Sequence, residues 1–223
     1  MPGMNSPLWT TFPSLEQEPA FLHAFTLRHP DIDVGVDRAE ALTRLTAWHH
    51  EVVESLGFSP AHLATAEQVH GNSIALVDTP GPVPFAQVDG LICRHENIML
   101  AIYVADCCAI YLVDRRTKAF GLLHSGRKGT EQNITGRAIQ TMQDQFGTRP
   151  EDLIVQLSPC IRPPSFEVDF AATICEQARA AGVKTTNIHD AGVCTSSDPS
   201  RFYSYRLEKG KTGRMLALLG RQG

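Results

Sequence analysis

Four short apolar segments follow one another through the middle of the chain, and polar or turn-forming residues bound each of them. They cover residues 91–93, 99–104, 109–113 and 119–123. Apolar runs of this length between turn residues are typical of buried β-strands. The pattern therefore predicts a sheet-forming centre in this part of the sequence.

Three other segments have the apolar spacing of an amphipathic helix. They are expected at about 38–56, around 138–146, and from residue 170 to Gly182. Asp37 and Asp169 are suited to be the N-caps of the first and third, and Asp37 with the Glu three residues later resembles a capping box. Gly57 and Gly147 follow the first and second helices, where a C-terminal stop is common.

Further strands are expected on both sides of the centre, at residues 21–27, 153–157 and 215–219. Residues 62–69 and 73–78 are expected to form a strand pair around a tight turn. Residues 1–20 are rich in Pro and weakly patterned, which predicts a loose lead-in. A single domain is therefore expected over residues 21–223.

The composition is that of a globular chain with a small acidic excess. Of the 223 residues, 43% are hydrophobic and 20% charged, and the net charge is -4 at pH 7. There is no basic stripe of the kind that nucleic-acid-binding proteins carry. No apolar run approaches the roughly 20 residues of a membrane-spanning helix. We therefore expect neither nucleic acid nor membrane as a partner, and a monomer or weak dimer.

The six cysteines include no CxxC pair and no compact disulfide spacing. The first residues lack the basic and apolar regions of a secretory signal. Reduced thiols are typical of the cytoplasm, which is the location that the sequence favours.

Reactive side chains come directly after strands at the sheet-forming centre. Asp106 and Cys107 follow the second apolar segment, His124 follows the fourth, and His70 ends an earlier strand-like segment. We expect the thiol and the imidazoles to meet in a cleft. Thiolate and imidazole suit zinc, and three protein ligands leave a fourth position open for water or substrate. The same ligands would also suit copper.

Two alternatives use the same residues. Cys107 is also suited to act as a nucleophile with His124 as its base. Alternatively, the thiol is a small buried hydrophobe and the imidazole only a hydrogen-bonding group. Cys108 is expected to point to the opposite face of its strand and to belong to the core.

A basic loop flanked by glycines follows His124. Its Arg127 and Lys128, with nearby backbone N–H groups, are suited to hold an anion such as phosphate. A solvated basic turn is the alternative. The GxxxxGK[ST] spacing of a Walker loop is missing.

Ordered motifs spread over nearly the whole chain resemble those of one family. They are QVHG at 68–71, DG at 89–90, ADC at 105–107, LHSG at 123–126, SPCI at 158–161, FEVD at 166–169, FYSYR at 202–206 and TGRMLALLG at 212–220. Together they resemble the polyphenol oxidase or laccase-domain family, whose members are better described as zinc-dependent purine nucleoside phosphorylases. Some bacterial members are discussed as peptidoglycan editing factors.

The resemblance implies an α/β (α+β) fold with two packed mixed β-sheets flanked by helices. It implies a zinc centre on His70, Cys107 and His124. It also implies phosphorolysis of adenosine, inosine, guanosine or methylthioadenosine, with deamination of adenosine as a second activity. Arg28, where the family has an Arg after its first strand, and Gln68 of the first motif are expected to contact the substrate.

In this hypothesis zinc activates a water or an anionic oxygen, while Arg28, Arg127 or Lys128 offsets the charge of phosphate. Asp106 is expected to transfer a proton or to orient a ligand imidazole, and Asp89 is the second candidate for the same role.

The chain departs from the family pattern at two places. The family usually has Trp-Arg after the His-Ala/Ser-Gly step, and here Arg127-Lys128 follows, so the Trp is absent. The usual glycine-rich run after the first strand is replaced by residues 29–36. The rim of the substrate site is therefore expected to differ from that of the family.

Three other functions compete with this hypothesis. A literal laccase is disfavoured, because a multicopper enzyme commonly uses HxH pairs and the nine histidines here form none. A cysteine hydrolase acting on a peptidoglycan precursor would use Cys107 without a metal. A non-catalytic metal-binding module would keep the ligands and turn over no nucleoside.

Overall fold

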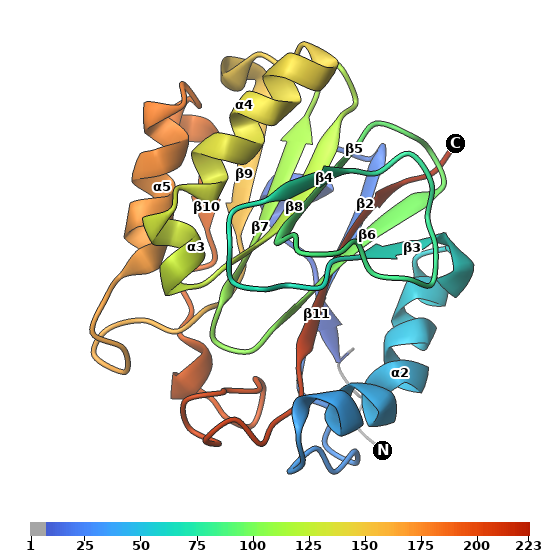
Figure 1. Ribbon diagram of the computed structural model, residues 1–223, viewed down its shortest axis with the longest axis vertical. Helices are drawn as coiled ribbons and strands as arrows, with labels where there is room; N and C mark the ends of the chain where they lie inside the picture. Colours follow the sequence, from blue (N-terminus) through green and yellow to red (C-terminus); the bar gives the residue numbers. More distant parts are fainter. Residues whose placement is uncertain (1–7) are drawn as a thin grey trace, which may run out of the picture.

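The apolar segments of the sequence form the strands of two sheets that are stacked face to face (Figure 1). The computed structural model describes residues 8–223. The five-stranded sheet contains, in spatial order, β1 (Trp9–Thr10), β2 (Phe21–Thr26), β11 (Met215–Arg221), β6 (Ile98–Val104) and β3 (Leu63–Thr65). The six-stranded sheet contains β10 (Ile188–Asp190), β9 (Leu153–Leu157), β7 (Cys108–Asp114), β8 (Phe120–Ser125), β5 (Gly90–Cys93) and β4 (Ile74–Leu76).

Both sheets are mixed. In the first, β3 runs parallel to β6, and the other pairs are antiparallel. In the second, β4 is parallel to β5 and β10 to β9, whereas β7 is antiparallel to both of its neighbours. The predicted fold class, two packed mixed sheets flanked by helices, is confirmed.

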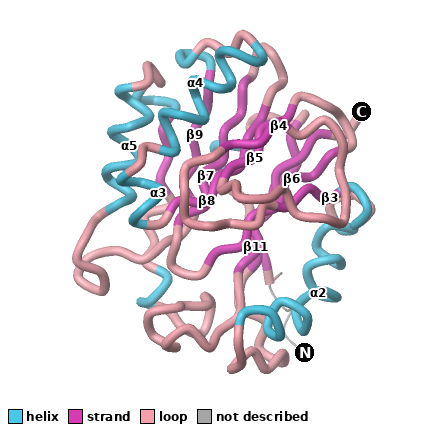
Figure 2. Tube along the Cα trace, viewed as in Figure 1, coloured by secondary structure: helices cyan, strands magenta, loops and turns pink. Residues whose placement is uncertain are grey.

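Helices cover the outer faces of the two sheets (Figure 2). The helices are α1 (Pro13–Glu16), α2 (Arg38–Ser55), α3 (Arg127–Glu131), α4 (Ile134–Phe146) and α5 (Phe170–Ala180). Of these, α2 packs on the five-stranded sheet and α4 with α5 on the six-stranded sheet, whereas Leu15 of α1 is buried in the layer between the sheets. As predicted, Asp37 caps α2, because its Oδ1 accepts the N–H groups of Ala39 and Glu40 at 2.9 and 3.1 Å. Gly147 ends α4 in the left-handed conformation that favours glycine, with φ +65°. No helix within residues 8–223 is long and apolar enough to cross a membrane.

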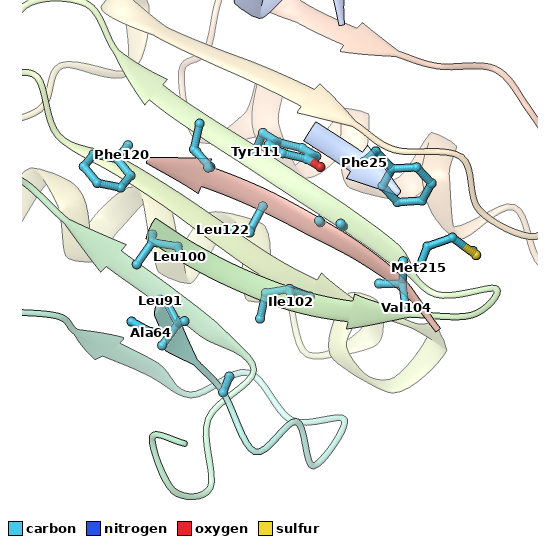
Figure 3. Packing of buried hydrophobic residues seen from close by; sticks show 14 of the residues in the cluster. Phe25, Ala64, Leu91, Leu100, Ile102, Val104, Tyr111, Phe120, Leu122 and Met215 are labelled. Atoms are coloured by element: carbon cyan, nitrogen blue, oxygen red, sulfur yellow. The ribbon is translucent and has the colours of Figure 1, made fainter. Parts of the chain in front are cut away.

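Side-chain alternation along the strands divides the interior into three apolar layers. The layer between the sheets includes Leu100 and Ile102 of β6 together with Tyr111 of β7 (Figure 3). A second layer lies between the six-stranded sheet and α4 with α5, and a third lies between the five-stranded sheet and α2. The hydroxyl of buried Tyr111 donates to the carbonyl of Ala24 at 2.9 Å and so links the two sheets.

Two expectations from the sequence need correction. Residues 62–69 and 73–78 do not form a strand pair. Instead β3 pairs with β6 in one sheet and β4 pairs with β5 in the other, so the turn between them leads from sheet to sheet. In the expected loose lead-in, residues 1–7 lie outside the described part. The rest is ordered, since it forms β1 and α1, and Leu15 is fully buried.

Candidate metal centre and its cavity

The alternation along β7 and β8 brings a thiol and an imidazole to one end of the layer between the sheets. On β8, Phe120 and Leu122 belong to this layer, and His124 follows with the same orientation. In the β7–β8 ladder His124 lies opposite Ala109, which also belongs to the layer. Cys107 precedes Ala109 by two residues and packs against the same layer.

His70 completes a group of three potential metal ligands with Cys107 and His124. One ligand atom from each side chain lies within 4.8 Å of the others. The two imidazole rings are 4.8 Å apart at their centroids and nearly perpendicular, at 83°. His124 is buried, Cys107 is half-buried and His70 is exposed, so the group is accessible from one side. The structure thus brings together the three residues that the sequence proposed as metal ligands.

A single buried carboxylate holds both histidines. Asp89 accepts the N–H groups of Val69, His70 and Gly71 at 3.1, 2.9 and 2.7 Å. Its Oδ1 also lies 2.8 Å from Nδ1 of His124. With Nδ1 occupied, Nε2 of His124 is left for a metal, which is the usual arrangement around a ligand histidine. The role of orienting an imidazole, which the sequence analysis gave first to Asp106, therefore fits Asp89.

The environment of Cys107 favours the thiolate. Burial alone would raise the pKa of this thiol. The charge of His124 and hydrogen bonds from His124 and His70 outweigh that effect, so the pKa of Cys107 is lowered. Burial likewise opposes the positive charge of His124, but the thiolate and Asp89 raise its pKa overall. A thiolate is the form of cysteine that binds metal.

The backbone around the site is unusual. Gln68, His70 and Asp106 have φ values of 61°, 63° and 78°, in the left-handed region that residues with a side chain rarely adopt. At Gly126 an added Cβ would lie only 2.6 Å from Sγ of Cys107. Such features are common where a site requires a fixed geometry.

The three candidate ligands line a cavity of about 1010 Å³. Four aromatic side chains also line it: Tyr103, Phe166, Phe170 and Tyr205. Its cationic side chains are those of Arg38, Arg127, Arg206, Lys209, Lys211 and Arg214. The acidic residues in the lining are Asp37 and Asp106. Although the chain as a whole is acidic, this cavity is strongly positive, which suits a substrate or cosubstrate that carries negative charge.

Of the residues expected to contact substrate, Gln68 and Arg127 line the cavity. The side-chain amide of Gln68 is engaged with the backbone of Tyr103, which it contacts at 2.6 and 2.9 Å. Arg127 forms ion pairs with Glu131 at 2.9 Å and with Glu167 at 3.3 Å.

The other two residues expected to contact substrate lie outside the cavity lining. Arg28 forms an ion pair of 2.6 Å with Glu208, and its guanidinium group lies 4.5 Å from the ring centroid of Tyr203. Lys128 is exposed on α3.

Asp106 organises the loops that form the cavity wall. Its Oδ1 accepts the hydroxyl of Thr195 at 2.7 Å. Its Oδ2 accepts the hydroxyl of Ser204 at 3.0 Å and the N–H of Arg206 at 2.7 Å. Both oxygens are therefore occupied by protein donors, which argues against the proton transfer proposed for this residue from the sequence.

Arg38 and Arg214 also line the cavity, and neither was expected there from the sequence. Arg38 is the first residue of α2, and Arg214 immediately precedes β11. Arg214 belongs to the TGR sequence of the last motif, which was the available indication of a role.

The donor set fits a metal ion such as zinc. A thiolate and two imidazoles are ligands that zinc accepts, and a carboxylate behind one imidazole is the common supporting group. The accessible side towards the cavity leaves room for a further ligand. Copper would accept the same three donors.

Comparison with known proteins finds relatives that are named purine nucleoside phosphorylases. A protein of Geobacillus stearothermophilus named purine nucleoside phosphorylase YlmD is 30% identical, and the match covers 86% of this chain and 82% of that protein. A purine nucleoside phosphorylase of Deinococcus radiodurans is 29% identical, with 89% and 88% covered.

Solved structures share the fold over almost the entire chain. The crystal structure of YlmD from Geobacillus stearothermophilus superposes with a TM-score of 0.85 at 25% identity, covering 99% of this chain and 98% of that one. The hypothetical protein YfiH of Bacillus licheniformis gives a TM-score of 0.85 at 20% identity, with 98% of each chain covered. The profile of the family described as multi-copper polyphenol oxidoreductase laccase matches residues 28–172 and 168–222. The chain therefore belongs to this laccase-like family.

Proposed function

We propose that the chain is a zinc-dependent purine nucleoside phosphorylase with adenosine deaminase activity. The observation that carries the proposal is the location of the His70, Cys107 and His124 group in the wall of a positive, partly aromatic cavity. Nucleosides need an apolar surface for the base, and phosphate needs cations. The names of the relatives support the same reaction class.

His70, Cys107 and His124 would hold the ion. When bound, zinc would supply a Lewis acid that activates a water or an anionic oxygen. Asp89 keeps the proton of His124 on Nδ1 and fixes the orientation of the ring. The aromatic side chains of the cavity offer surfaces for the purine and exclude water from its faces.

The two reactions differ in their second substrate. In phosphorolysis an oxygen of hydrogen phosphate forms a bond to C1′ of the ribose while the bond between C1′ and the base breaks. The bonding electron pair goes to the base nitrogen, and the proton of the phosphate ends on the base. In deamination water replaces the amino group of adenosine, and inosine and ammonia are formed.

The test combines metal analysis with product analysis. The protein is purified without an affinity metal, its bound metal is measured by elemental analysis, and adenosine is supplied with and without phosphate. We expect about one zinc per chain for three protein ligands, adenine release that depends on phosphate, and inosine formation that does not. Cys107→Ala should lose both zinc and turnover, while Cys175→Ala, a half-buried thiol outside the cavity lining, should keep both. Activity retained in zinc-free Cys107→Ala would contradict the metal centre.

The outcomes separate the alternatives. Copper in place of zinc would change the proposed metal but not the ligand group. A metal-free protein that an alkylating agent inactivates at Cys107 would favour the cysteine hydrolase, with a peptidoglycan precursor as the next substrate to test. Bound zinc without turnover of any nucleoside would favour a metal-binding module.

A further inference from the structure

We propose that Arg38 and Arg214 form the binding site for inorganic phosphate, the cosubstrate of phosphorolysis. This assignment rests on the proposed function and extends it, because the sequence had pointed to Arg28, Arg127 and Lys128 for this role. Two arginines of the cavity, Arg127 and Arg206, form ion pairs with carboxylates, whereas Arg38 and Arg214 form none within residues 8–223.

Arg214 is a buried cation without a counter-ion. It is 8% exposed and lines the cavity. Its Nη1 donates to the carbonyls of Thr212 and Gly213, both at 2.8 Å. Within residues 8–223 its other guanidinium nitrogens have no acceptor and no carboxylate pairs with it. Removing a charge from water without a partner is costly, so a buried guanidinium facing a cavity is suited to an anionic ligand.

Arg38 supplies a second unpaired guanidinium in the same cavity wall. Its side chain makes no ion pair with any residue of the described chain, although it is on the same helix as Arg44, which pairs with Asp33 and Glu40. Arg38 and Arg214 line the same cavity, and after burial the positive charge of Arg38 is the largest influence that lowers the pKa of Arg214. Two positive charges that line one cavity repel each other, and an anion bound by both would offset that repulsion.

No carboxylate of the described chain forms an ion pair with either guanidinium, although the charges of Cys107 and Asp106 oppose the lowering of the Arg214 pKa. Asp37, next to Arg38, uses its Oδ1 to cap α2. Asp106 is occupied by the hydroxyls of Thr195 and Ser204 and by a backbone N–H. A phosphate held by Arg38 and Arg214 would therefore not displace a carboxylate from either guanidinium.

The remaining arginines of the cavity are already paired. Arg127 and Arg206 both contact Glu167, at 3.3 and 3.8 Å, and Arg127 also contacts Glu131. Planar guanidinium groups bind phosphate oxygens with two parallel hydrogen bonds, which makes an arginine pair well suited to a tetrahedral dianion. Lys209 and Lys211, which also line the cavity, add positive charge.

Direct phosphate binding tests the assignment without requiring turnover. Zinc-loaded wild-type protein, Arg38→Gln and Arg214→Lys are titrated with inorganic phosphate by isothermal calorimetry. Arg44→Gln is the matched control, because it removes the same charge from the same helix outside the cavity. We expect phosphate affinity to fall at least tenfold in Arg38→Gln and Arg214→Lys and to change less than twofold in Arg44→Gln. Arg38 is exposed, so its variant is expected to fold even if Arg214→Lys does not.

Steady-state kinetics with adenosine give a second measurement. Deamination uses water and not phosphate, so the two variants should raise the KM for phosphate at least tenfold and should lower the rate of phosphorolysis at subsaturating phosphate far more than the rate of deamination. A merely structural role would lower both activities together and would contradict the assignment.

Titration with adenosine 5′-monophosphate distinguishes a free phosphate from a phosphate that is part of a nucleotide. If Arg38→Gln weakens binding of the nucleotide but not of inorganic phosphate, the assignment to the cosubstrate is wrong. Unchanged phosphate affinity in Arg38→Gln and in folded Arg214→Lys would also overturn it. If phosphate binding is lost as expected but wild-type protein cleaves no nucleoside, the phosphate site stands and the proposed function fails.

Discussion

Nδ1 of His124 and Oδ1 of Asp89 form a 2.8 Å hydrogen bond between two buried side chains. The same carboxylate accepts the backbone N–H of His70 at 2.9 Å. One side chain thereby fixes the ring of one candidate ligand and the backbone of another. Burial raises the pKa of Asp89, but the hydrogen bonds from His124 and Gly71 outweigh it and lower the pKa overall. A permanent negative charge therefore lies behind the metal site.

Asp89→Asn is expected to weaken zinc binding about 10–100-fold, the usual effect of removing the partner of a ligand histidine. Asn keeps the volume of the side chain but removes the charge that supports His124. Zinc affinity is measured by competition with a chromophoric chelator. Asp114→Asn is the control, because Asp114 is equally buried and accepts hydrogen bonds from Arg116 and Thr117 outside the cavity. Wild-type zinc affinity in Asp89→Asn would contradict the orienting role.

Gly126→Ala is expected to displace the thiol of Cys107. The added Cβ would lie 2.6 Å from Sγ, closer than any ordinary contact, and Sγ is the atom needed for the metal. We expect a fold that is retained with a loss of about 1–3 kcal/mol from overpacking, and a zinc content far below that of wild type. Gly81→Ala is the control, since nothing lies within 4 Å of its added Cβ. Circular dichroism checks the fold and elemental analysis the zinc; full zinc occupancy in Gly126→Ala would count against this account.

Asp106→Asn separates a positioning role from proton transfer. Loss of a charged acceptor for Thr195, Ser204 and Arg206 should loosen the cavity wall and raise the KM for nucleoside about tenfold, the equivalent of roughly 1.4 kcal/mol. The shape of the pH profile of kcat should stay the same, because the carboxylate transfers no proton. Asp198→Asn, at a half-buried residue outside the cavity lining that accepts the hydroxyl of Ser200, should leave the KM and the pH profile unchanged. Loss of one limb of the pH profile in Asp106→Asn would restore the catalytic assignment.

Local patterns were sufficient to predict much of the fold. The capping Asp37 and the stop at Gly147 mark helix ends through contacts with their own neighbours in the chain. The alternation of side chains predicted Cys108 in the core, and it is fully buried on the helix-covered face of its sheet. These features depend on residues a few positions apart, which the sequence displays directly.

Features that depend on distant segments were not predictable in the same way. β3 pairs with β6 in one sheet, and β4 pairs with β5 in the other. No local pattern shows that two strands so close in sequence enter different sheets. Asp89 was ranked behind Asp106 because the sequence does not show which buried carboxylate reaches an imidazole. Arg214 acquires its importance because its buried guanidinium forms no ion pair within residues 8–223, and only the three-dimensional arrangement shows this.

His23 makes the stability of the protein depend on pH. Its Nε2 accepts the N–H of Phe12 at 2.8 Å, and burial lowers its pKa to about 4, although Glu16 opposes the shift. The unfolded chain should bind the proton near the ordinary pKa of 6.5, so acidification favours unfolding. Stability is then fully present above about pH 6.5 and is lost progressively as the pH falls towards 4.

At pH 5 the loss attributable to His23 should be about 2 kcal/mol. The measurement is the free energy of urea unfolding at pH 7.5 and 5.0, in the presence of a chelator so that metal loss does not contribute. His23→Gln keeps an acceptor for Phe12 and cannot be protonated, so its decrease between the two pH values should be about 2 kcal/mol smaller than that of wild type. His49, whose pKa burial also lowers to about 4, should account for part of the decrease that remains. Equal decreases in wild type and His23→Gln would show that the proton responsible binds elsewhere.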